Sequence, residues 1–369
     1  MATNTHIPVR SARRCIVRPA VSKFVFATAV AIATSSALAC FGALNASPEV
    51  AKATRPAGTQ AVASKGFGYP IKPFNSEHPI RGNFGDPRMQ FHGPPTLRTL
   101  LRGSGSFSFH QGVDIAAPNG TAVYPVVDGT VAIVTSEGVR VNSSDGRAFD
   151  YWHIRRLVRK GQQVVAQQTV LGHIIKPAGH VHLTEYEDGR VVNPLVPGRL
   201  TPYHDSTRPS VRSIVFRRND TGRELLPSFV RGSVEIVVDA EDMPCMPVHG
   251  KWHGLPVTPA LITWQIQSVT GRTVVSQRVA VDSRTTVSRN SSFWQVYARG
   301  TYQNMAVFGS HYSYMQRGSY LFKLTPRPFE TQSLRDGVYD LIVTASDIRG
   351  NRGSQTLRFT VHNRSGWGG

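Results

Sequence analysis

The chain has little cysteine. It contains three cysteines in 369 residues, and two of them, Cys15 and Cys40, fall in the N-terminal segment. Cys245 is then the one cysteine of the presumed folded part, so a framework of disulfide bonds is not available to it. The hydrophobic content of 40% instead predicts folding around ordinary apolar cores, and a chain of this length can form more than one of them.

Helix signals are nearly absent as well. The chain has short runs rich in Val, Ile and Thr, separated by Gly, Pro and Asp, and such runs are typical of strands. The run TAVYPVV (121–127) is followed by Asp128-Gly129 and then by TVAIV (130–134), which predicts a β-hairpin with Asp-Gly at its turn. We therefore predict an all-β protein.

The N-terminal segment has the composition of an export signal. An apolar run over residues 24–44 contains Ala37-Leu38-Ala39, a candidate cleavage site, and follows five basic residues: Arg10, Arg13, Arg14, Arg18 and Lys23. The run is long enough to span a bilayer, so a retained anchor is the alternative to a cleaved signal. We expect residues 1–44 to be a signal peptide or signal anchor, and residues 45–68, rich in Ala, Thr, Ser and Pro, to be a flexible linker.

Five polar residues further along the chain have the chemistry of a hydrolytic metal site: His110, Asp114, His153, His180 and His182. Zinc is a common metal in such sites. A hydrolytic zinc ion needs three protein ligands and one open position for water, and further histidines can transfer protons. In an extended segment His180 and His182 point to one face, as do His110 and Asp114, with Gly112 leaving room between the latter two. The chain has 13 histidines, so the prediction depends on the conjunction and not on one pair.

The motifs around these residues are FGDPR (84–88), FHQGVDIAAPNGTAVYPVVDGTV (109–131), YWHI (151–154) and GHVHL (179–183). In sequence and order they resemble the lysostaphin-type (LytM-like) zinc metalloendopeptidases of bacterial cell walls, over roughly residues 80–196. The resemblance implies a small antiparallel β-sheet peptidase domain of the duplicated hybrid motif type. It further implies the roles of five residues: His110, Asp114 and His182 bind Zn²⁺, while His153 and His180 assist catalysis.

The activity implied by this resemblance is hydrolysis of peptide bonds in peptidoglycan stem peptides or cross-bridges by a zinc-activated water. His153 and His180 would hydrogen-bond the water or the developing oxyanion and pass a proton to the departing amine. No HExxH motif, with its glutamate base, occurs in the sequence.

Two other classes of function stay open. The first is a non-catalytic relative that binds cell wall or activates a separate amidase, although all five site residues are present here. The second is a biotinyl or lipoyl carrier, which the hairpin PVVDGTVAIV (125–134) resembles, but the apex of that hairpin has Asp-Gly and no lysine to modify. An active zinc endopeptidase is therefore the preferred reading.

The sequence departs from the family's pattern after the His-x-His pair. The family has an aromatic residue and a glutamate there, whereas this chain has Leu183, Thr184 and then Glu185, which leaves the support of His182 open. A fourth ligand that keeps the enzyme latent is known in the family. Asn83 is the position where we look for one.

The second half of the chain predicts a separate β domain. Seven β-type segments separated by turns follow residue 211 and favour a β-sandwich, and DGVYDLIVTASDIRGN (336–351) resembles late strands of immunoglobulin-like or fibronectin-like modules. We expect a zinc endopeptidase domain at 69–199, a linker at 200–211 and a β-sandwich accessory domain at 212–364. We expect this accessory domain to act either as a spacer or as a module that binds cell wall or a protein partner. We expect three tryptophans to pack in cores or loops and not to form a sugar-binding platform: Trp252, Trp264 and Trp294.

The charge of the chain is strongly basic, because 42 Lys and Arg stand against 23 Asp and Glu, a formal net charge of +19. Such an excess attracts polyanions in a salt-dependent way. No dense basic helix or recognised nucleic-acid-binding module is present, so we expect no nucleic-acid partner. For an extracytoplasmic bacterial protein, whether secreted, periplasmic or wall-associated, the expected partners are peptidoglycan and anionic wall polymers, and a membrane only if the signal segment is retained. The alternative is that the positive charge only keeps the protein soluble.

Overall fold

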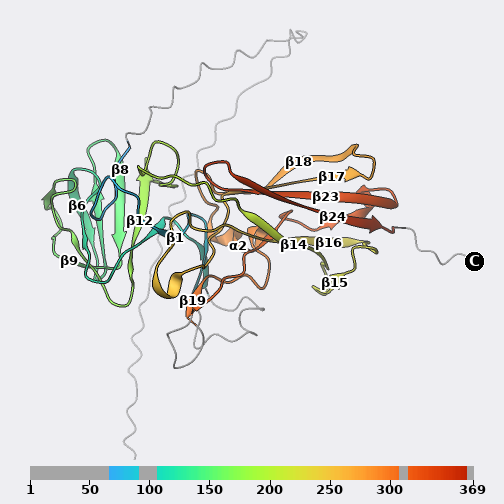
Figure 1. The fold of residues 1–369 in the computed structure, drawn as a ribbon, viewed down its shortest axis with the longest axis horizontal. Helices are drawn as coiled ribbons and strands as arrows, with labels where there is room; N and C mark the ends of the chain where they lie inside the picture. The colour runs from blue at the N-terminus through green and yellow to red at the C-terminus, as the bar shows by residue number, and fades with distance from the viewer. Residues whose placement is uncertain (1–65, 91–105, 307–314, 364–369) are drawn as a thin grey trace, which may run out of the picture. The chain divides into compact units, whose positions relative to one another are not determined.

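The computed structural model describes residues 66–90, 106–306 and 315–363, and these belong to one compact unit, Gln60–Gly369 (Figure 1). The predicted signal segment, 1–44, and almost all of the predicted linker, 45–68, lie outside the described residues. Within them strands dominate, and α2 (Phe293–Val296) is the one α-helix. No helix in this part of the chain is long and apolar enough to cross a membrane. The expected all-β fold is confirmed.

The first half of the described chain forms a large antiparallel sheet with two small sheets beside it. Green strands β6, β8 and β12 of the large sheet lie side by side in Figure 1. The large sheet has the order β1 (Ile80–Gly82), β4 (Val113–Ala116), β12 (His180–Glu187), β8 (Arg147–Trp152), β7 (Gly138–Asn142), β6 (Gly129–Val134), β10 (Gln163–Val164), with β13 (Arg190–Val192) on β12. The small sheets are β5 (Ala122–Val123), β11 (Gly172–Ile174), β9 (Ile154–Arg156), and β2 (Pro87–Gln90), β3 (Ser106–Phe109).

Alternation of apolar residues along these strands builds the first core. Side chains two positions apart on a strand share a face, and in β7, β8 and β12 that face is buried by Val, Phe, Tyr and Leu. The buried pairs are Val139 and Val141, Phe149 and Tyr151, Val181 and Leu183. Because Val181 and Leu183 of β12 point inward, the alternate residues of that strand, His180 and His182 among them, share the opposite face.

The predicted hairpin around Asp128-Gly129 is wrong. β5 pairs with β11, whereas β6 pairs with β7 and β10, so the two runs belong to different sheets. Pro125 has no N–H to donate to a hairpin ladder. The neighbouring backbone groups bond elsewhere: the Tyr124 N–H donates to the carbonyl of Pro70, and the Val126 N–H donates to the Tyr151 hydroxyl.

The second half forms two larger antiparallel sheets that enclose a second core. In Figure 1, β17, β23 and β24 lie side by side in orange and red. One sheet has the order β15 (Glu224–Leu225), β14 (Ser210–Arg218), β16 (Ser233–Glu241), β21 (Leu321–Lys323), with β22 (Phe329–Glu330) on β16; the other is β18 (Thr273–Asp282), β17 (Leu261–Ser268), β23 (Gly337–Ser346), β24 (Arg352–Val361). Short elements complete this half: η1 (Gly250–Trp252), η2 (Asn290–Ser292), η3 (Thr331–Ser333), β19 (Met305–Ala306) and β20 (Met315–Gln316).

Both sheets contribute to this core, as a sandwich requires. Ile236 and Phe216 come from one sheet, and Trp264, Leu341 and Phe359 come from the other, all at most 2% exposed. The seven β-type segments expected after residue 211 correspond to β14, β16, β17, β18, β21, β23 and β24. The immunoglobulin-like or fibronectin-like character of this sandwich, and the division into domains at 69–199, 200–211 and 212–364, stay predictions.

The two halves meet along the FGDPR motif. The Asp86 carboxylate accepts hydrogen bonds from the N–H of Thr258 at 3.0 Å and from its hydroxyl at 2.6 Å. The buried Tyr297 hydroxyl donates to the carbonyl of Gly85 at 2.7 Å. Phe109, which ends β3, packs in the second core and not in the first. The second half therefore packs directly against the segment that leads into the candidate metal ligands.

Candidate metal centre

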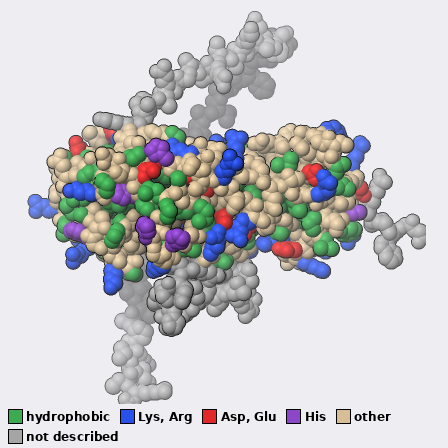
Figure 2. Space-filling model, viewed as in Figure 1, with side chains coloured by type: hydrophobic (Ala, Val, Ile, Leu, Met, Phe, Trp, Pro, Cys, Tyr) green, Lys and Arg blue, Asp and Glu red, His purple; other side chains and the backbone are tan. Residues whose placement is uncertain are grey.

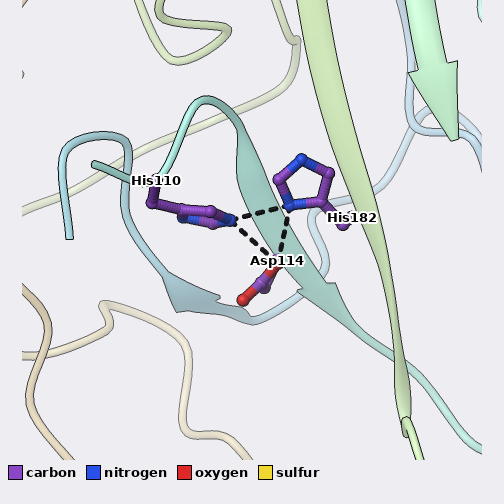
Figure 3. A group of neighbouring side chains, drawn as sticks. All are labelled: His110, Asp114 and His182. Atoms are coloured by element: carbon purple, nitrogen blue, oxygen red, sulfur yellow. Dashed lines mark hydrogen bonds and ion pairs between the residues drawn. The ribbon is translucent and has the colours of Figure 1, made fainter. Parts of the chain in front are cut away.

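Neighbouring strands bring the predicted ligands together. Asp114 lies on β4 and stands opposite His182 of β12 in the antiparallel register. His110 lies just after β3, on the short turn that leads into β4 (Figure 3). This turn needs Gly112, because a Cβ there would lie 2.3 Å from the carbonyl oxygen of Leu183 and 2.8 Å from Nε2 of His182.

The three candidate ligand atoms converge on one point. His110 Nε2 lies 3.1 Å from Asp114 Oδ1 and 2.7 Å from His182 Nδ1, which is itself 3.1 Å from the same oxygen (Figure 3). Two ligands at about 2.0 Å from a tetrahedral zinc lie roughly 3.3 Å apart. Small outward movements would therefore seat an ion among these atoms. The donor set of two imidazoles and one carboxylate is one that zinc accepts.

The second nitrogen of each ligand ring is held by a neighbour. His110 Nδ1 lies 2.8 Å from the backbone carbonyl oxygen of Asn83, and His182 Nε2 lies 2.8 Å from the Thr184 hydroxyl oxygen. With the proton on those nitrogens, His110 Nε2 and His182 Nδ1 present lone pairs to the ion. Thr184 thus supplies the support of His182 that the departure from the family's pattern had left open.

Asn83 contacts the candidate ligand His110 through its backbone. Its backbone carbonyl orients His110, and its side-chain nitrogen donates to the carbonyl of Thr258 at 3.0 Å. Its amide therefore bonds to the second half of the chain, and latency through this side chain stays a hypothesis.

Charge around the ligands favours coordination. The second oxygen of Asp114 accepts a hydrogen bond from Arg88 at 2.7 Å. Burial opposes ionisation of Asp114, but His110, His180 and Arg88 outweigh it and hold the pKa of this carboxyl well below its usual range. Burial, assisted by the charge of Arg88, lowers the pKa of His110 to about 3. At neutral pH the carboxylate is ionised and the imidazole is neutral, which are the forms that bind a metal.

The two predicted catalytic histidines lie beside this group. The ring centroids of His153 and His180 are 4.5 Å apart, and Nε2 of His180 lies 3.4 Å from Asp114 Oδ1. His153 has a φ of 66°, an uncommon backbone conformation for a residue other than glycine, and its carbonyl accepts a hydrogen bond from the Ile175 N–H. Burial and the neighbouring His180 lower the pKa of His153 to about 4, so its ring is neutral and can accept a proton at pH 7.

The five residues border one cavity of about 630 Å³, which leaves room for a substrate next to the ligand atoms. Part of its wall comes from the second half of the chain, which the sequence had not predicted: Trp252, Asn290, Gln303, Asn304 and Tyr320. Trp264, by contrast, lies in the second core as expected, and Trp294 packs against Phe107.

Another group of acidic residues, Asp205, Asp242 and Asp347, also offers three atoms within 4.8 Å of one another. It has only carboxylate oxygens and no imidazole, and it borders no comparable cavity among the pockets of the described residues. A hydrolytic zinc with an open position is therefore supported at His110, Asp114 and His182 and not here.

The fold and the site define a class: a β-sheet domain with a His/Asp/His group that could hold a metal ion and two further histidines in its cavity. Residues 108–194, which include all five residues, match the model of peptidase family M23. The lysostaphin-type resemblance is confirmed. No curated protein gives a significant match.

Several solved structures are similar to part of the chain. The catalytic domain of lysostaphin from Staphylococcus simulans is 19% identical, with a TM-score of 0.24, over 31% of this chain and 86% of that one. A zinc-containing peptidase from Vibrio cholerae is 23% identical, with a TM-score of 0.27, over 35% of this chain and 39% of that one. A chain of the SpoIIQ–SpoIIIAH pore-forming complex is 21% identical, with a TM-score of 0.27, over 36% of this chain and 89% of that one.

Proposed function

We propose that this protein is an exported zinc metalloendopeptidase that hydrolyses peptide bonds in the stem peptides or cross-bridges of peptidoglycan. The observation that carries the proposal is the convergence of His110 Nε2, Asp114 Oδ1 and His182 Nδ1, with two further histidines, His153 and His180, in the same cavity. The match of residues 108–194 to a peptidase family supports the reaction class. The substrate is inferred from the lysostaphin-type resemblance.

The chain's own residues divide the chemistry between them. When bound, zinc would supply a water whose pKa is lowered to about 7 and would polarise the scissile carbonyl. Asp114 and the two ligand histidines hold the ion, while Arg88 and Thr184 hold two of these ligands in place. His153 and His180 hydrogen-bond the reacting oxygen and deliver a proton to the departing amine.

Digestion of purified peptidoglycan sacculi tests the proposal. Protein loaded with zinc is expected to clear sacculi in a zymogram, and a chelator is expected to abolish clearing until zinc is restored. Mass spectrometry of the released fragments would identify the bond that is cut. Absence of clearing by a fully zinc-loaded protein would favour the alternative, a relative that binds cell wall or activates a separate amidase.

Export is part of the same proposal. The supporting feature is the basic and apolar N-terminal segment, 1–44, and fractionation of the producing bacterium with N-terminal sequencing would distinguish cleaved from anchored protein. Binding to anionic wall polymers would use the basic surface. In Figure 2 the Lys and Arg side chains on the visible face are scattered, with Asp and Glu among them. A dispersed charge favours weak, salt-dependent association with a polymer over one defined binding site.

A further inference from the structure

One cation in the wall of the site cavity lacks an acidic partner. Arg81, on β1, lines the cavity, and the described residues provide no ion pair for its guanidinium. Arg88, the other arginine of this wall, is by contrast paired with Asp114 at 2.7 Å and with Asp86 at 3.5 Å. Burial lowers the pKa of Arg81 to about 10, so the side chain keeps its positive charge at neutral pH.

Two contacts hold this guanidinium in position. Its terminal nitrogen lies 2.6 Å from Nδ1 of His180, and its carbon lies 3.8 Å from the ring centroid of Trp252, which belongs to the second half of the chain. The Nε of Arg81 is buried without a hydrogen-bond partner in the described part of the chain. Stacking on an aromatic face fixes a guanidinium but does not neutralise its charge. A cation that lines a cavity without an ion pair of its own favours an anionic group of a bound molecule beside it.

The rest of this wall suits a peptide. The Gln303 side-chain oxygen accepts a hydrogen bond from the Met89 N–H at 3.2 Å, and the Asn290 oxygen accepts one from the Phe109 N–H at 3.1 Å. Both amides line the cavity, and with their oxygens engaged their NH₂ groups are the remaining polar atoms. Such donors match the carbonyl groups of an extended peptide.

We propose that Arg81, backed by Trp252, binds a carboxylate of an acidic peptide substrate, and that the second half of the chain thereby contributes to substrate choice. The inference rests on the proposed peptidase function and specifies its substrate class. The carboxylate would lie in the cavity next to His180, close to the bond that is cut. Arg81 then has a role beyond positioning His180, and charge selectivity distinguishes the two roles.

The test measures binding and not turnover. Zinc-loaded protein carrying His153→Ala, which we expect not to hydrolyse peptides, is titrated with two stem peptides that differ only in a free or an amidated D-glutamate α-carboxyl group. The free carboxylate is expected to bind about 10-fold more tightly, the order of one charge-assisted hydrogen-bonded pair. Adding Arg81→Gln is expected to remove this preference, and adding Trp252→Leu is expected to reduce it.

Lys251→Gln is the matched control, because Lys251 is an exposed cation next to Trp252 that does not line the cavity. It is expected to keep the preference. Equal affinity of the two peptides, no binding of either, or an equal loss for both in Arg81→Gln protein with native zinc content and native unfolding temperature would overturn the proposal. Sacculus digestion by the unmodified protein is scored separately. Charge-selective binding without digestion would therefore refute the peptidase and leave the carboxylate site standing.

Discussion

Replacing Thr184 by valine removes the hydroxyl oxygen that lies 2.8 Å from Nε2 of His182 and leaves a side chain of nearly the same shape. Thr184 is only 3% exposed, so water has little access to take its place. The ring nitrogen would then keep its proton without an acceptor or move it to Nδ1, the atom that faces the metal. Either outcome weakens His182 as a ligand.

The size of the effect follows from the burial of this contact. A buried N–H without a partner costs about 1–3 kcal/mol, and about 1.4 kcal/mol corresponds to a factor of ten in a binding constant. Loss of a partner that orients a metal-bound histidine weakens metal affinity by about 10–100-fold in general. We therefore expect Thr184→Val to bind zinc 10- to 100-fold more weakly than the unmodified protein.

Competition with a chromophoric chelator measures the zinc dissociation constant directly. Thr184→Ser keeps the hydroxyl and is the matched control, with an affinity expected within about threefold of the native value. Thermal unfolding of the metal-free proteins checks that valine has not disturbed β12. Unchanged zinc affinity in a correctly folded Thr184→Val protein would show that the hydroxyl does not orient His182, and the reasoning would be refuted.

Three further predictions address other parts of the molecule. His153→Ala is expected to keep stoichiometric zinc while nearly abolishing hydrolysis; loss of zinc, measured by atomic absorption, would contradict a catalytic role. In the metal-free protein, NMR titration of ring signals is expected to give His153 a midpoint near pH 4, because burial favours its neutral form; a midpoint above 6 would contradict this. Tyr297→Phe, which removes the hydrogen bond to Gly85, is expected to lower the free energy of unfolding by about 1 kcal/mol in denaturant titrations, with no change expected from substituting exposed Leu226 by Ala.

The convergence of His110, Asp114 and His182 could be predicted from the sequence because its geometry is local. His180 and His182 are two residues apart on one strand, and His110 and Asp114 are joined by a turn that Gly112 makes possible. Thr184 could have been found by the same rule, since it lies two residues beyond His182 and therefore on the same face of β12.

Other features could not be predicted because they depend on partners that are distant in sequence. The Asp-Gly signal for a hairpin was local, but the groups that pair with the chain around Pro125 are Pro70 and Tyr151. Likewise, nothing in the spacing of residues 81 and 252 indicates that a guanidinium and an indole stack at 3.8 Å. The local sequence pattern predicts the strands and their faces. The partners of individual backbone and side-chain groups depend on tertiary packing, which the local pattern does not contain.

The contacts between the two halves argue against a role of the second half as a simple spacer. A spacer domain would meet the peptidase domain through a linker and leave its cavity alone, but here Asp86, buried at 2% exposure, has its carboxylate satisfied by Thr258. Removing the second half would leave one oxygen of that buried carboxylate, and the face of Phe109, without their partners, while the other oxygen keeps the Asn83 N–H and Arg88. A small β domain cannot easily absorb that cost. Trp252 and two fixed amides add to the same wall. The site of this protein is therefore better described as a product of both halves than as a peptidase domain with an attached module.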